Sequence, residues 1–437
     1  MRRSLLAVFA AGAVAVAAFV ACVGDDAPTP ATTPDSDAAT TGDGPASSGD
    51  GSGGGQDSGG DSASSGCTTS QTACNGGCVE TTSFQTDAKS CGACGHDCLG
   101  ATCTGGKCAA IPIFPATVTD AATVEPVRNI VVDATTVYFT ASQAANGSGS
   151  PGFYSCPIAG CASPTLLLAG NTWGLAMTPT APTRILFSIP QDDVVLRYSP
   201  AGSGGDRFTS CAGNELLCRF SGFPQSDAIA TDGTTVYWGT GVPGPGGFNG
   251  NNGYKVALPN GGAAIDLGSA AAGTAISMVS AALDSDDATK KYLYVADSTG
   301  DGGRILAFTT SGTPAPVVLA GSGSTTGVSS VIVKNGLVYW ASKTGIYSAP
   351  VCPAASCPAT PPTPVKVYAI ANATAVVADA TKLYFAAGAT VSSCTFASCA
   401  TPKPLFEGAT ANVLSLAQDA TAIYLGDDHG NVARVAK

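Results

Sequence analysis

Hydrophobic residues from about position 111 onward recur in one short pattern. Two or three apolar residues precede an Asp turn, and an apolar residue, a tyrosine and an aromatic residue follow it, as in 130–139 (IVVDATTVYF) and 229–238 (IATDGTTVYW). Two further copies are 376–385 (VVADATKLYF) and 416–425 (LAQDATAIYL); looser copies end in 338–340 and 293–295, and a degenerate one includes 185–187. Because Asp bonds the backbone just after it and accepts turn geometry, each copy predicts a hairpin whose second strand is buried.

The copies recur at a fairly regular interval. The positions that mark them are Tyr138, Leu186, Tyr237, Tyr294, Tyr339, Tyr384 and Tyr424, which lie 48, 51, 57, 45, 45 and 40 residues apart. Repeats of this length that contain several short strands are typical of propeller blades. The sequence therefore predicts an all-β chain in which 109–437 forms a β-propeller, with seven blades favoured and six left open.

The two ends of this repeat region are complementary. The last copy supplies strands near 414–418, 422–426 and 431–436, and no fourth strand follows. The segment 110–115 (AIPIFP) precedes the first full copy and is similar to 402–406 (PKPLF), a predicted fourth strand. We therefore expect the N-terminal segment to complete the last blade, which leaves no open sheet edge. The repeats, with pairs such as Tyr237-Trp238 and Tyr339-Trp340, resemble those of YWTD and NHL-like propellers of extracellular proteins.

The N-terminus has the pattern of an export signal. Arg2 and Arg3 precede an apolar run of 17 residues, 5–21, which is shorter than a typical spanning helix. The segment 19–22 (FVAC) resembles the bacterial lipobox, in which the cysteine becomes the lipid-bearing first residue; Phe19 departs from the usual Leu. The resemblance implies a signal peptide over 1–21 and lipidation at Cys22. An ordinary signal peptide and an uncleaved anchor are the alternatives.

Residues 22–66 are expected to form a lipid-anchored tether. They consist almost entirely of Gly, Ser, Asp, Ala, Thr and Pro and show no apolar periodicity, which is the composition of a disordered linker.

Residues 67–108 contain eight cysteines and few large apolar residues, so covalent links must hold this segment together. Zinc binding by Cys91, Cys94, His96 and Cys98 is an alternative, but export favours disulfides. Eight cysteines allow 105 pairings, and the sequence does not select one. The runs 74–79 (CNGGCV), 91–95 (CGACG) and 103–108 (CTGGKC) resemble a stigma-specific-protein-like module, which implies a structural or binding role without catalysis. The cysteines of this module are Cys67, Cys74, Cys78, Cys91, Cys94, Cys98, Cys103 and Cys108.

Eight further cysteines lie in close pairs within the repeats, where the outer hairpins of blades are expected. Short loops of this kind favour local disulfides, each worth about 2 kcal/mol in the chain-entropy model. The pairs are Cys156 with Cys161, Cys211 with Cys218, Cys352 with Cys357, and Cys394 with Cys399.

Composition and charge exclude several functions. A net charge of −11 argues against a phosphate-backbone binder, so no nucleic-acid partner is expected. Only two histidines occur, His96 and His429, and no hydrolase, zinc-protease or P-loop motif is present. His429 is expected in a hairpin turn. The loop 297–303 resembles a calcium loop but lacks the distal Glu, and 243–253 is a candidate binding loop.

The sequence therefore predicts a lipid-anchored envelope protein of the outer membrane, facing the periplasm or the cell surface. We expect it to be non-enzymatic, to contain no cofactor or metal, and to bind a protein or glycan through its propeller. A propeller lyase or hydrolase acting on an extracellular polymer, and a purely structural envelope component, are the alternatives. The ligand and the oligomeric state stay open.

Overall fold

In the computed structural model the described residues belong to one compact unit, which lies within Ser64–Lys437. The structure describes residues 66–437 except 75, 115–125, 143–149, 180–182, 190–193, 199–207, 211–227, 240–251, 259–264, 270–277, 285–286, 288–290, 299–302, 312–315, 322, 354–355, 359 and 409–410. The predicted signal peptide, the tether and Cys22 therefore lie outside the described residues. No helix in the described part of the chain has the length and apolar character needed to cross a membrane.

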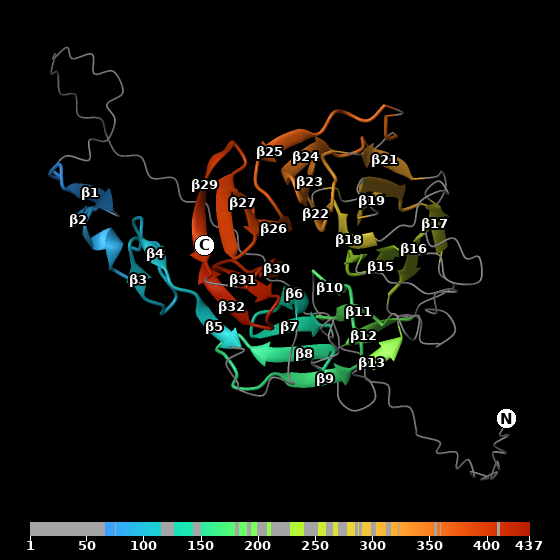
Figure 1. Cartoon of the computed structure of the whole chain (residues 1–437), viewed down its shortest axis with the longest axis horizontal. Helices are drawn as coiled ribbons and strands as arrows, with labels where there is room; N and C mark the ends of the chain where they lie inside the picture. The colour runs from blue at the N-terminus through green and yellow to red at the C-terminus, as the bar shows by residue number, and fades with distance from the viewer. Residues whose placement is uncertain are drawn as a thin grey trace, which may run out of the picture. The chain divides into compact units, whose positions relative to one another are not determined.

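The described residues after position 110 form seven four-stranded antiparallel sheets, arranged around a common centre in Figure 1. Each of the seven repeat copies contributes the first two strands of one sheet. The first three sheets consist of β6 (Val127–Val132), β7 (Thr136–Ala141), β8 (Gly152–Pro157) and β9 (Thr165–Ala169); β10 (Leu175–Met177), β11 (Ile185–Ile189), β12 (Val194–Tyr198) and β13 (Phe208–Ser210); and β14 (Ile229–Thr231), β15 (Thr235–Gly239), β16 (Asn252–Ala257) and β17 (Ile265–Ser269).

The next three sheets follow the same order along the chain. They consist of β18 (Met278–Leu283), β19 (Tyr292–Asp297), β20 (Arg304–Thr309) and β21 (Val317–Ala320); β22 (Ser330–Lys334), β23 (Leu337–Ser342), β24 (Gly345–Pro350) and β25 (Val365–Tyr368); and β26 (Ala373–Ala378), β27 (Lys382–Ala387), β28 (Thr390–Thr395) and β29 (Ser398–Glu407). The fold is an all-β propeller, as the repeat pattern predicts.

The last sheet joins the two ends of the repeat region. It contains β30 (Val413–Gln418), β31 (Ala422–Asp427), β32 (Val432–Ala436) and, as its fourth strand, β5 (Ile111–Phe114). β5 pairs antiparallel with β32, with Ile111 opposite Arg434 and Phe114 opposite Val432. The predicted completion of the last sheet by the N-terminal segment is therefore confirmed.

The innermost strands close the ring. Each contacts the first strand of the next sheet, and β30 of the last sheet contacts β6 of the first. Hydrogen bonds cross these junctions: Ser415 Oγ donates to the Val127 carbonyl at 3.1 Å, and Thr374 Oγ1 donates to the Val413 carbonyl at 2.6 Å. A Cβ on Gly426 would lie 2.3 Å from Val127 Cγ1, so only glycine permits this close approach at the closing junction.

The second strand of each sheet forms the core. Every residue of β19 and of β31 is buried, because each sheet packs between two others and both of its faces are covered. Trp238, Trp340, Tyr294, Tyr384 and Tyr424 are among the largest fully buried side chains. The aromatic residues of the repeat therefore pack between adjacent sheets and form the core there.

The cysteine-rich segment contains little regular structure. It comprises β1 (Gln71–Cys74), β2 (Gly77–Glu80), the 3₁₀ turn η1 (Ser83–Gln85), β3 (Cys103–Thr104) and β4 (Lys107–Cys108). Its buried residues are mostly half-cystines, with Phe84 as the exception among large side chains. β4 contacts β29, and Ala436 of β32 packs with Cys91, Cys98 and Cys108.

Candidate functional site

The Asp of each regular repeat organises the turn between the first two strands. Asp133 Oδ1 accepts hydrogen bonds from the backbone N–H groups of Thr135 and Thr136, both at 2.8 Å, as the turn chemistry predicts. Its Oδ2 accepts a hydrogen bond from the hydroxyl of Tyr138 at 3.2 Å. The same set of contacts recurs at Asp232, Asp379 and Asp419. The tyrosine is therefore both a core residue and a turn ligand, a role that the constant five-residue spacing could have indicated.

In the turns of Asp379 and Asp419 these contacts shift the pKa of both the aspartate and the tyrosine. Burial alone would raise the pKa of Asp379, but hydrogen bonds from Thr381, Tyr384 and Lys382 and the charge of Lys437 lower that pKa well below its ordinary value. The pKa of Asp419 is lowered in the same way. Burial, followed by the charge of Asp232, raises the pKa of Tyr237 to about 12. The pairs Asp379–Tyr384 and Asp419–Tyr424 are thus tuned to stay as carboxylate and neutral phenol, since the pKa of each Asp is lowered and the pKa of each Tyr is raised.

These pKa shifts predict a loss of stability in acid. A carboxyl whose pKa is lower in the folded than in the unfolded state stabilises the fold above about pH 4, and this contribution disappears as the pH falls. We expect the free energy of unfolding, measured by chemical denaturation, to fall more steeply between about pH 5 and pH 2 in the wild type than in an Asp379→Asn/Asp419→Asn variant. The control is the double variant Glu80→Gln/Asp266→Asn, which removes two exposed carboxylates outside these turns. Equal acid sensitivity in both double variants would contradict this role for the turns.

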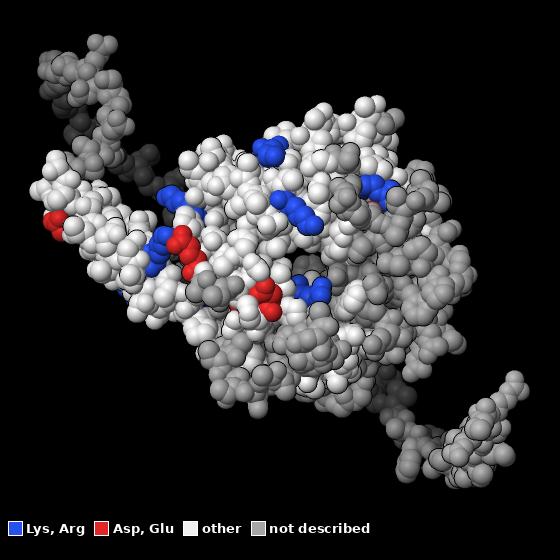
Figure 2. All heavy atoms as spheres, in the orientation of Figure 1, with Lys and Arg blue, Asp and Glu red and all other residues white. Residues whose placement is uncertain are grey.

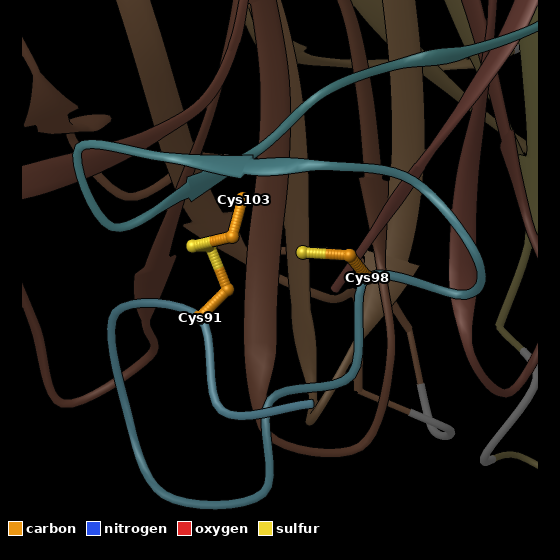
Figure 3. A group of neighbouring side chains, drawn as sticks. All are labelled: Cys91, Cys98 and Cys103. Atoms are coloured by element: carbon orange, nitrogen blue, oxygen red, sulfur yellow. A yellow bond between two sulfur atoms is a disulfide. The ribbon is translucent and has the colours of Figure 1, made fainter. Parts of the chain in front are cut away.

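The cysteine-rich segment is joined by four overlapping disulfides. They are Cys67–Cys78, Cys74–Cys94, Cys91–Cys103 and Cys98–Cys108. The sulfur atoms of Cys91, Cys98 and Cys103 lie within 4.8 Å of one another, and Figure 3 shows Cys98 beside the Cys91–Cys103 bridge. Because all three belong to disulfides, this close group of sulfurs offers no thiolate to a metal ion.

The local cysteine pairs staple outer hairpins of the propeller. Cys156–Cys161, Cys352–Cys357 and Cys394–Cys399 are disulfides. The first and third join the end of a third strand to the connection or strand that follows, and Cys352–Cys357 lies within the connection between β24 and β25. Cys211 and Cys218, the fourth predicted pair, lie outside the described residues. All fourteen cysteines of the described part of the chain are disulfide-bonded.

The remaining candidates from the sequence do not converge on one place. Asp297, the first residue of the suspected calcium loop, is fully buried at the end of β19, and its Oδ2 accepts hydrogen bonds from Arg304 Nη2 at 2.8 Å and Nε at 3.0 Å. Positions 299–302 are not described. His429 lies in the β31–β32 turn, as predicted, with Nδ1 2.9 Å from Asp428 Oδ1. Of the loop 243–253, only Asn252 and Gly253 of β16 are described.

The cysteine module and the last two sheets enclose a cleft of about 550 Å³, which the sequence analysis did not identify. The module contributes 91–97, Leu99 and 106–108. The propeller contributes the start of β27, Ser393 of β28, 403–405 in β29, the turn before β31, the last residue of β32 and Lys437 after it. Lys107 Nζ lies 3.0 Å from Glu407 Oε1 at the junction. Figure 2 shows few charged side chains on the face in view, several of them where the module meets the sheet that ends in β29.

Four lysines, Lys107, Lys382, Lys403 and Lys437, line this cleft together with His96. Ser393 lies opposite Tyr384 on one side and Lys403 on the other, so these three residues share one face of their sheet. The cleft opens at the face of the ring that carries the Asp turns, because Lys382 and Thr421 directly follow those turns. No spacing in the sequence links these lysines, which come from β27, β29, the residue after β32 and the module.

Comparison with known proteins identifies the fold only. No family model and no curated protein matches the chain. Similar solved structures include a catalytically inactive virginiamycin B lyase from Staphylococcus aureus with quinupristin, at 14% identity over 73% of this chain and 97% of that chain, with a TM-score of 0.52. A streptogramin B lyase is 12% identical over 75% of this chain and 97% of its own, with a TM-score of 0.51. At such identities the likeness shows a shared β-propeller and carries no activity across.

Proposed function

We propose that the chain is a non-enzymatic, lipid-anchored protein of the bacterial cell envelope that binds a protein or glycan partner through its propeller. In this proposal Cys22 carries the lipid, the anchor lies in the outer membrane, and the folded part faces the periplasm or the cell surface. The observation that carries the proposal is the disulfide bonding of every described cysteine. Such a set of bridges persists in oxidising compartments and is rare in the cytosol.

The number of cysteines that lack a disulfide partner supports lipidation of Cys22. The chain has 17 cysteines, of which fourteen form disulfides in the described residues. If Cys211 and Cys218 pair as expected, Cys22 is the one cysteine without a partner. A single cysteine directly after an apolar export signal is the residue that a lipid-transfer system modifies in proteins with a lipobox.

Replacement of this cysteine tests the anchor. We expect the wild-type chain, expressed in a bacterium that processes lipoproteins, to fractionate with the outer membrane. A Cys22→Ala variant is expected to be absent from the outer-membrane fraction. Mass spectrometry of the N-terminal peptide is expected to show an acylated Cys22 at the start of the mature chain. A control variant with Ser4→Ala keeps the basic start and the cysteine, and is expected to stay in the membrane fraction. An unmodified Cys22 in the wild type would refute the anchor.

The propeller supports the binding role by its construction. Its seven sheets, which we propose act as the blades of one ring, are closed by β5 and stapled by three described disulfides, so the loops at either face are held on a rigid support. Rigid supports with variable loops suit recognition, because little conformational freedom is lost on binding. Screening the chain from residue 23 on protein and glycan arrays tests this role; a complete lack of binders would favour a structural one.

A further inference from the structure

We infer that the cleft between the cysteine module and the last two sheets binds an anionic saccharide through carboxylate or phosphate groups on its sugars. This inference rests on the binding function proposed above and assigns to it a site and a ligand class.

The cleft is basic in a chain that is acidic overall. The whole chain has 20 Lys and Arg residues against 31 Asp and Glu, yet four lysines line this one cavity. Lys382 and Lys403 form no ion pair with any described residue, whereas Lys107 is paired with Glu407. Asp97 is the one carboxylate among the described residues that line the cleft, and it is already paired with Lys89 at 2.7 Å. Two ammonium groups without an ion pair on one concave surface attract anions.

Lys437 adds a fixed positive charge at the wall of the cleft. Its side chain is 10% exposed, its Nζ lies 3.4 Å from Asp379 Oδ2, and the ammonium lies 5.3 Å from the centre of the Tyr384 ring. Asp379 also accepts hydrogen bonds from the turn and from Tyr384, so its charge is shared among several donors. Lys437 is therefore held in place before any ligand arrives, which lowers the entropic cost of binding.

The module side of the cleft contributes a histidine with an unused ring nitrogen. His96 Nδ1 lies 2.5 Å from the Cys91 carbonyl oxygen, which acts as the acceptor and so fixes the ring. Its Nε2 is buried and has no hydrogen-bond partner among the described residues. A buried ring nitrogen without a partner is costly unless a ligand or water satisfies it.

The walls suit a hydrated ligand better than an apolar peptide. The hydroxyls of Ser393 and Thr421 and the backbone of Gly92, Gly95 and Gly106 line the cleft, and Leu405 is one of the few large apolar side chains there. Peptide-binding sites usually offer pockets for apolar anchors, whereas sugars require many polar contacts around one or two apolar surfaces. A cavity of about 550 Å³ is large enough for two or three sugar rings.

Titration calorimetry on the chain from residue 23 tests this assignment with four probes: trigalacturonate, the neutral galactotriose, mannose 6-phosphate and a hexaglutamate peptide. We expect trigalacturonate, mannose 6-phosphate or both to bind, galactotriose to bind at least about tenfold more weakly, and high ionic strength to weaken the interaction. Trigalacturonate and mannose 6-phosphate together separate carboxylate from phosphate as the recognised group. Lys382→Gln/Lys403→Gln is expected to lower the affinity about tenfold or more, because each lost ammonium removes a charge-assisted hydrogen bond.

The control variant is Lys343→Gln/Lys366→Gln, which removes the same charge from exposed lysines outside the cleft. Lys382→Arg/Lys403→Arg, which keeps the charge, is expected to retain binding, and unchanged unfolding temperatures would show that all variants fold. Equal binding of galactotriose, an equal loss in the control, tighter binding of hexaglutamate, or no binding of any probe would each overturn the assignment. Binding partners found on the arrays that do not depend on Lys382 and Lys403 would leave the proposed function standing without this site.

Discussion

Replacing Ile113 with aspartate is expected to destabilise the ring by about 3–5 kcal/mol, the magnitude for an uncompensated buried charge. Ile113 lies in β5, is 1% exposed, and packs in a cluster with Phe139, Tyr154 and Tyr424 from the first and last sheets. A carboxylate there has no partner, so β5 would be displaced from β32. Chemical denaturation measures the loss, and size-exclusion chromatography reports the self-association expected of an exposed sheet edge.

Val365→Asp is the matched control for this prediction. Val365 also belongs to the outermost strand of a sheet, β25, but is 62% exposed. Its replacement is expected to change the free energy of unfolding by less than about 0.5 kcal/mol. Should Ile113→Asp and Val365→Asp prove equally mild, the closing role of β5 would have to be abandoned.

Removing one disulfide of the cysteine module is expected to unfold the module while the propeller stays folded. Cys91–Cys103 closes a loop with a sequence separation of 12 residues, and Cys91 is fully buried. A bridge of this span stabilises by about 3 kcal/mol in the chain-entropy model, and the module has little apolar burial to compensate for its loss. In Cys91→Ser/Cys103→Ser, hydrogen exchange is expected to show loss of protection across 67–108 and retained protection in β19 and β31.

Cys394→Ser/Cys399→Ser provides the comparison for the module variant. This bridge spans five residues in the hairpin between β28 and β29, whose backbone pairing remains without it. We expect a cost of about 2 kcal/mol and unchanged exchange in the module. If the module keeps its protection in Cys91→Ser/Cys103→Ser, then apolar packing rather than covalent linkage holds it together.

The features that the sequence predicted are those encoded by local residue order. The Asp turns, the buried tyrosine strands and the stapled outer hairpins each involve residues within one hairpin, so their spacing is visible in the chain. The completion of the last sheet by 111–114 is a long-range contact, but it was predictable because a sheet with a missing strand and a spare strand of similar sequence occur at opposite ends of one repeat array.

The features that the sequence could not predict depend on how separate parts pack. The pairing of Cys74 with Cys94 and of Cys91 with Cys103 follows from the path of the module backbone, which has no repeat to indicate it. The cleft brings Lys107 together with Lys382, Lys403 and Lys437 only because β4 contacts β29. Each of these lysines alone is typical of a solvated surface position.

The order of the four module disulfides has a mechanical consequence. The loop closed by each disulfide overlaps the loop closed by the next. The shortest covalent path from Cys67 to Cys108 therefore runs through the four bridges and through the short backbone segments 74–78, 91–94 and 98–103. Tension applied at the N-terminal side of Cys67 would therefore lengthen the module very little and would pass almost undiminished to Ile111–Phe114. There the tension would act on the backbone hydrogen bonds between β5 and β32. The first part to give way under tension is therefore the pairing of these two strands, and not a disulfide.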